Sequence, residues 1–96
     1  MAEANVLAAP GRYAYANLDA AGGTLLKTGI GSLGGVVVGT GASGASISLY
    51  DGTSDAGALI AAISAAAPIS LSYGVQFFYG LYAVVTDAPN ITVSYT

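Results

Sequence analysis

The stretch SYGVQFFYGLYAVVTDAPNITVSYT, residues 72–96, decides the fold class. Two apolar runs are separated by Tyr79-Gly80, and a third run, alternating with Thr and Ser, follows the turn-forming residues 87–90. Alternation with a period of two is typical of β-strands whose two faces meet different surroundings. The stretch therefore predicts three consecutive antiparallel strands arranged as a meander.

The same alternation extends upstream to Ile69. Apolar side chains at the odd positions from Ile69 to Phe77, among them Tyr73, alternate with Ser and Gln. A glycine inside a strand marks a bulge or a bend. We therefore expect one long strand that bends at Gly74. The odd positions should face the core, and in the last strand Tyr95 should also face inward.

Glycines divide the first half of the chain into short segments, as in an all-β sandwich or barrel with frequent turns. Period-two alternation predicts strands in segments 11–19 and 44–52, the latter ending at the turn Asp51-Gly52. Shorter strands are expected at 24–29 and at Val36–Val38, which we interpret as a buried strand. The prediction is an all-β, antiparallel, jelly-roll-like sandwich of 7–8 strands.

Two further segments need separate interpretation. Residues 1–10 are expected to form an extended N-terminal arm before a single domain at 11–96, because Pro10 disfavours helix at the preceding residue. The segment ALIAAI, residues 58–63, is ambiguous. Its alanines favour a helix, and Leu59, Ile60 and Ile63 share one helical face. It is nevertheless short for an isolated helix, and we favour a strand.

The composition predicts a protein that needs a partner. A 96-residue domain buries a modest share of its surface, so its stability is low unless a disulfide, a metal ion or a partner adds to it. Cys and His are both absent, which excludes disulfides and nearly excludes the usual zinc and iron–sulfur sites. Charged residues are only 7% of the chain, against about 25% in ordinary soluble domains. Oligomerisation is the remaining route to stability.

Several classes of function are disfavoured by the same composition. Two basic residues, Arg12 and Lys27, are too few to neutralise a run of phosphates, so we expect no nucleic-acid partner. Gly, Ser and Thr interrupt every apolar run, so we expect no membrane span. No basic region followed by an apolar one opens the chain, so synthesis is expected in the cytoplasm.

Catalysis and cofactors are also not expected. General acid–base chemistry usually needs His or paired carboxylates, and the acids Asp51, Asp55 and Asp87 fall in predicted turns, where each should cap its own backbone. DGTSD, residues 51–55, resembles the start of a calcium loop, but alanines stand where a Gly and a bidentate Glu are required. We expect no catalytic residue, no cofactor and no metal.

Aromatic side chains remain as candidates for a functional surface. Interface cores are enriched in aromatic residues and depleted in Lys, Glu and Asp. Strand parity sends several aromatic side chains outward, and others lie beside the arm. The predicted interface residues are Tyr13, Tyr15, Tyr50, Phe78 and Tyr82.

The second half of the chain resembles small structural proteins of tailed bacteriophages. The resemblance lies in SLYDGTSDAGALIAAI followed by YGVQFFYGLYAVVTDAPNITVSY. In those proteins a strand ending in a Tyr-Asp turn leads to a short Ile-Ala-x-Ile strand, an aromatic strand, a Gly-Leu-x-Val-Val strand and a closing Thr-Val-x-Tyr. The matching positions here are 49–51, 60–63, 80–85 and 92–95.

The resemblance implies a β-sandwich or jelly roll that decorates or cements a capsid, commonly as a trimer. It also implies a strand at 58–63. The expected partners are the major capsid protein of the same virion and further copies of the chain, and the expected location is the virion surface. The alternative is a carbohydrate- or receptor-binding module of a head fibre or tail appendage. A third interpretation, independent of phage, is a fibre subunit that associates through exposed strand edges.

Overall fold

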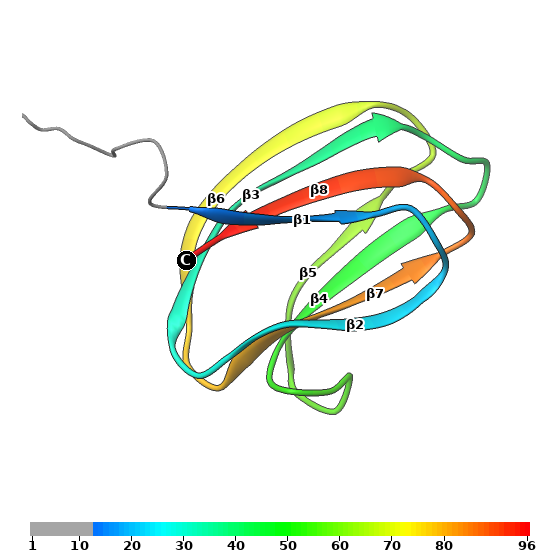
Figure 1. Cartoon of the computed structure of the whole chain (residues 1–96). Coiled ribbons are helices and arrows are strands. Elements are labelled where there is room, and N and C mark those ends of the chain that lie inside the picture. The colour runs from blue at the N-terminus through cyan, green and yellow to red at the C-terminus, as the bar shows by residue number, and fades with distance from the viewer. Residues whose placement is uncertain (1–12) are drawn as a thin grey trace, which may run out of the picture.

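The computed structural model describes residues 13–96, which form two four-stranded antiparallel sheets in two layers (Figure 1). The predicted all-β antiparallel sandwich is confirmed. The predicted arm at 1–10 lies outside the described residues. The strands are β1 (Ala14–Leu18), β2 (Gly22–Thr28), β3 (Gly31–Thr40), β4 (Ser46–Asp51), β5 (Ala58–Ser64), β6 (Ile69–Phe77), β7 (Gly80–Thr86) and β8 (Asn90–Tyr95).

The topology follows from pairing the first half of the chain with the second. β1 pairs with β8, β2 with β7, β3 with β6 and β4 with β5, all antiparallel. The chain is thus one long antiparallel ribbon, rolled so that successive pairs fall in opposite sheets. Contacts of β3 with β8 and of β4 with β7 complete the orders β1-β8-β3-β6 and β2-β7-β4-β5. This arrangement is an eight-stranded jelly roll.

The predicted meander of the last three strands is wrong. β6 and β8 belong to one sheet, on either side of β3, and β7 belongs to the other sheet. Alternation along a strand records which face is buried, but it does not record which strand lies alongside. The connections after Phe77 and after Thr86 therefore cross between layers, although their sequences look like ordinary hairpin turns.

The segment 58–63 lies in a strand, so the favoured interpretation is confirmed and the helical one is wrong. β5 pairs along its length with β4, and Ile63 is buried opposite Ile47. Tertiary pairing outweighs the helix preference of the alanines, because a helix this short gains little from propensity alone.

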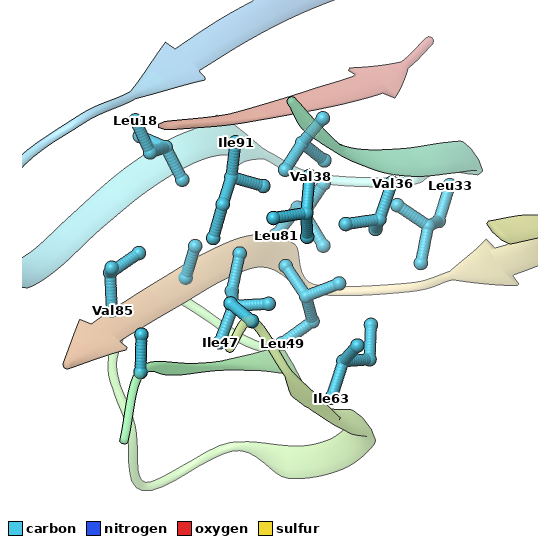
Figure 2. Close-up of a cluster of buried hydrophobic side chains, with 14 of the residues drawn as sticks. Leu18, Leu33, Val36, Val38, Ile47, Leu49, Ile63, Leu81, Val85 and Ile91 are labelled. Carbon is cyan, nitrogen blue, oxygen red and sulfur yellow. The ribbon is translucent and has the colours of Figure 1, made fainter. Parts of the chain in front are cut away.

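Both sheets contribute one face to an apolar core between the layers. Figure 2 shows Val38 and Ile91 of one sheet pointing toward Ile47 and Leu49 of the other. No polar or charged residue among residues 13–96 is buried. The buried apolar residues are Leu18, Leu33, Val36, Val38, Ala45, Ile47, Leu49, Ile63, Ala65, Phe77, Leu81, Ala83, Val85, Ile91 and Val93.

The structure of β3 and β6 corrects the predicted burial of Val36–Val38 and confirms the predicted bend at Gly74. The Val36–Val38 run is only partly buried, because Val37 points to the outer face and is exposed. Tyr73 and Tyr95 pack against the core and are partly buried, as predicted. Gly74 has a φ of 64°, and the ladder between β3 and β6 shifts register beside it. The predicted bend is therefore a β-bulge at Gly74.

Candidate interface

A row of four large side chains crosses the outer face of the β2-β7-β4-β5 sheet. Leu25 pairs with Tyr82, Tyr82 with Tyr50, and Tyr50 with Leu59. Strands lie about 4.8 Å apart, so the row runs for about 14 Å at right angles to the strands. We name these four residues the aromatic row.

The aromatic row is open to solvent at both ends and half-buried in the middle. Leu25 and Leu59 are 44% and 57% exposed, and Tyr50 and Tyr82 are partly exposed between them. Aromatic cross-strand pairs stabilise a sheet by up to about 1 kcal/mol, so the central pair has a structural role as well as an exposed surface.

The Tyr82 ring extends over β2 because Gly23 leaves room for it. A Cβ atom at position 23 would overlap the Tyr82 hydroxyl and contact its ring. The tyrosine therefore extends from the aromatic row across the next outward-facing row, in which Val84, Ser48 and Ala62 follow Gly23. Neither row contains a charged residue, so this face combines aromatic and aliphatic surface as interface cores do.

A second exposed apolar group lies at the end of the sandwich. The turn between β6 and β7 presents Phe78 and Tyr79, which are 58% and 74% exposed, and the turn between β2 and β3 presents Ile30. The Gly29 backbone N–H donates to the Tyr79 carbonyl at 3.0 Å and links the two turns. We name Ile30, Phe78 and Tyr79 the tip cluster.

Asp51 holds the tip cluster in place. The Phe78 backbone N–H donates to both carboxylate oxygens of Asp51 at 3.0 Å, and the Tyr79 N–H donates to Oδ1 at 2.8 Å. The prediction that Asp51 caps its own turn is therefore wrong, because it caps a turn that follows 27 residues later in the chain. The exposed side chains of Phe78 and Tyr79 thus extend from a turn whose backbone is hydrogen-bonded to the Asp51 carboxylate.

Tyr13 and Tyr15 lie on the opposite outer face. Tyr15 is 74% exposed on β1 opposite Ser94, and the Tyr13 ring lies against Gly34 of β3. The neighbouring outward side chains of this sheet are mainly hydroxyl-bearing or amide-bearing. Asn17 donates to the side-chain oxygens of Asn90 and Thr92 at 2.9 and 3.2 Å. This face is polar and contrasts with the face that carries the aromatic row.

The structure thus distributes the five predicted interface residues over three surfaces. Tyr50 and Tyr82 lie side by side, Tyr13 and Tyr15 share the opposite face, and Phe78 lies at the end. Whether any of them binds a partner stays a prediction.

Sequence reasoning missed half of the aromatic row and most of the tip cluster. Bulges beside Leu25 and Leu59 interrupt the alternation there, so parity could not assign these side chains to the outer face. The alternation places Tyr79 only in the separator between two strands and predicts no role for its side chain. A neighbouring glycine in a short apolar linker was the available signal that Tyr79 lies in an exposed turn.

The remaining predicted acids are turn residues at the surface. Asp87 has a φ of 59°, a left-handed conformation that Asp tolerates better than most residues, and it lies between β7 and β8. Asp55 lies exposed between β4 and β5. Within residues 13–96, no group of three or more His, Cys, Asp or Glu could hold a metal ion. The same residues include no helix with the length and apolar content needed to cross a membrane.

Comparison with known proteins found no matching family, no matching curated protein and no matching solved structure.

Proposed function

We propose that this chain is a structural protein of a tailed-bacteriophage virion that binds the outside of the capsid and stabilises it. Its partners are the major capsid protein of the same virion and other copies of the chain, for which the resemblance favours a trimer. Synthesis takes place in the host cytoplasm, assembly on the virion surface, and no catalytic step or cofactor is involved.

The observation that supports this proposal most directly is the aromatic row on an uncharged sheet face. Leu25, Tyr82, Tyr50 and Leu59 form a flat apolar strip on a domain with few charged residues. Trp, Tyr and Arg dominate the binding energy of protein interfaces, so the two tyrosines are the expected centre of the contact. Eight-stranded jelly rolls occur in viral capsid proteins, which is a likeness of fold only.

A capsid shell presents the same surface many times, which suits a small docking face. A four-stranded sheet about 14 Å across and about 20 Å along the strands offers roughly 300 Å² of contact surface. That area is below the roughly 800 Å² per partner of a standard stable interface. Several copies held together raise the strength of attachment without enlarging any single contact. The proposal therefore joins face binding to self-association.

The test uses virions purified from the host that makes this protein, together with empty shells prepared from them. Immunogold electron microscopy with antibody against the chain should label the capsid. In co-sedimentation with the shells, Tyr82→Ala should weaken binding at least about tenfold, because central aromatic residues contribute about 2 kcal/mol or more. Tyr15→Ala on the opposite face is the matched control and should bind like the wild type. Absence of label from the virions contradicts the proposal.

The alternative function, a carbohydrate- or receptor-binding module of a head fibre or tail appendage, is favoured by the polar face. Tyr15 stands exposed beside Ser94, and Asn17 and Thr92 lie in the next outward row. An aromatic ring next to hydroxyl and amide groups suits stacking and hydrogen bonding to a sugar. A glycan array separates the two functions. Saturable binding that Tyr15→Ala abolishes and Tyr82→Ala preserves would replace the capsid proposal with this one.

A further inference from the structure

Within residues 13–96, both sheets end in an unpaired strand edge on the same side of the sandwich. Among these residues β5 pairs only with β4, and β6 pairs only with β3, so each is an edge strand. The two strands are consecutive and are joined by the short connection 65–68, so they lie above one another in the two layers. We name this side the β5–β6 flank. An edge strand presents unpaired backbone N–H and C=O groups that can pair with another strand.

The β5–β6 flank lacks the charged side chains and prolines that commonly prevent such pairing. No Asp, Glu, Lys or Arg occurs between Asp55 and Asp87, and neither strand contains proline. The opposite flank is different, because β2 contains Lys27 and Asp19 follows β1. Charged side chains and proline on an edge strand are the common protection against edge-to-edge association. One flank is thus protected and the other is open.

Part of the core is exposed on the β5–β6 flank, mainly at β6. One row of inward side chains crosses the first sheet from Leu18 through Ile91 and Val38 to Ile69. Leu18 is 9% exposed, whereas Ile69 at the other end is 44% exposed. Leu71 and Ile60 also pack against the core while remaining partly exposed. In the β1-β8-β3-β6 sheet this inward row is therefore nearly closed at the β1 edge and exposed at the β6 edge.

The regular parts of the two edge strands lie at the same level of the sandwich. Residues 61–64 of β5 pair with β4 without a register shift, and residues 69–72 of β6 pair with β3 in the same way. Bulges fall only in the other half of each strand, away from the connection 65–68. The two regular segments adjoin that connection, so a single axis perpendicular to the sheets can pass beside both.

We propose that two copies of this chain associate through their β5–β6 flanks about a two-fold axis perpendicular to the sheets, which makes the solution species a dimer in place of the trimer that the resemblance favours. Such an axis reverses strand direction, so it places β5 antiparallel to β5 of the second copy and β6 antiparallel to β6. Each four-stranded sheet becomes part of an eight-stranded one. The exposed inward side chains Ile69 and Leu71 are covered by the same residues of the other copy, as a self-complementary interface requires.

The expected association is weak. The regular segment of β6, residues 69–72, gives a paired edge about 13 Å long, and the flank is about 15 Å wide across two layers about 10 Å apart. The paired strands then bury roughly 400 Å² in total, well below the roughly 1,200 Å² of standard specific interfaces. The dimer should accordingly form in a concentration-dependent manner.

A cysteine scan locates the proposed axis, because the natural chain contains no cysteine. A disulfide requires Cα atoms within about 7 Å, and residues directly opposite in an antiparallel pair are about 4.5–5.5 Å apart. Only residues close to the axis face their own counterparts. Mild oxidation should therefore cross-link some of the single variants Ala62→Cys, Ser64→Cys, Ser70→Cys and Ser72→Cys strongly and their neighbours weakly. Thr24→Cys and Ala14→Cys, on the opposite edges, are the controls and should form no disulfide cross-link.

Light scattering coupled to size-exclusion chromatography tests the same flank without cross-linking. The wild-type mass should rise toward that of two copies as loading increases from about 10 μM to about 1 mM, the range of weak complexes. The double variant Ala62→Lys/Ser70→Lys should need at least about tenfold more protein to associate, because like charges would face each other across the axis. Thr24→Lys should behave like the wild type.

Three outcomes would overturn the proposal: a wild-type monomer at every concentration, a mass of three copies, or equal cross-linking on both flanks. None of these outcomes depends on capsids, so the flank proposal can fail while capsid binding stands. Conversely, a protein that forms the flank dimer but does not bind capsids would support this inference and contradict the proposed function.

Discussion

Asp51 at the end of β4 accepts hydrogen bonds from the backbone of Phe78, so an acidic side chain of one strand fixes the turn that joins two others. The turn crosses from one sheet to the other, and its two aromatic residues are exposed members of the tip cluster. The carboxylate links the layers at this end of the sandwich and gives the exposed rings a fixed backbone.

Replacing Asp51 by Ala should destabilise the protein and loosen the tip cluster. Hydrogen bonds to charged groups contribute about 1.5–3 kcal/mol, and those of Asp51 are exposed, so we expect a smaller loss of about 1–2 kcal/mol. Urea unfolding measures the change, and amide exchange of Phe78 and Tyr79 should accelerate. Asp55→Ala, in the adjacent exposed loop, should alter stability by less than about 0.5 kcal/mol. Equal effects of the two variants would contradict the role given to Asp51.

Phe77 and Phe78 are adjacent in the chain but should differ sharply when replaced by Ala. Phe77 is fully buried, so Phe77→Ala should cost about 3–5 kcal/mol, comparable to the whole stability of a small domain. Phe78 is exposed, so Phe78→Ala should change the free energy of unfolding by about 0.5 kcal/mol or less. Thermal and urea unfolding of the two variants provide the measurement. A destabilised Phe78→Ala protein would show that the tip cluster is part of the core.

Gly23→Ala should move the Tyr82 ring without unfolding the sheet. The new methyl group would occupy the position of the Tyr82 hydroxyl, which lies at the end of a rotatable side chain. We expect a change in stability of less than about 1 kcal/mol, because loss of the ring contact is offset by the smaller entropy of the unfolded chain. NMR contacts between Tyr82 and β2 should disappear.

Capsid binding by Gly23→Ala should fall nearly as far as in Tyr82→Ala, if the ring position on the sheet face is what the shell contacts. Unchanged binding despite a displaced ring would exclude Tyr82 from the contact, and attention would shift to the tip cluster. Comparing Gly23→Ala with Tyr82→Ala separates the effect of moving the Tyr82 ring from the effect of removing it.

Gly74→Ala should reveal the cost of the bulge in β6. The φ of 64° at this position is left-handed, and no atom lies within 4 Å of an added Cβ, so the penalty is purely conformational. We expect a loss of about 1–2 kcal/mol in urea unfolding. Gly39→Ala, at a β3 glycine with ordinary Cβ contacts, should leave stability unchanged or raise it by up to about 1 kcal/mol. A neutral Gly74→Ala would mean that the strand straightens readily.

Strand positions were predictable because burial on one face leaves a period of two in the sequence. Ile47 and Leu49 of β4, or Ile91 and Val93 of β8, alternate with Ser and Thr, and each proved to be buried. The choice of neighbours was not predictable in this way. β8 pairs with β1 and β3, which are distant in the sequence, and nothing in the alternation of β8 distinguishes those partners from β7.

The candidate interface was only partly predictable for a related reason. Tyr50 and Tyr82 were assigned outward from undisturbed alternation, whereas the bulges next to Leu25 and Leu59 hid the rest of the aromatic row. The partnership of Asp51 with Phe78 depends on two connections meeting at one end of the roll. A local sequence pattern carries no information about such a meeting.

The position of β8 between β1 and β3 has a consequence for biosynthesis. β1 and β3 are joined in one sheet only through β8, so this sheet cannot form until Asn90–Tyr95 has left the ribosome. Until then the apolar segments of the nascent chain remain exposed to solvent. Folds dominated by contacts between residues distant in the sequence form slowly, and unpaired apolar segments are prone to aggregate during that time. Translation of this protein should therefore draw on chaperones more heavily than its small size suggests.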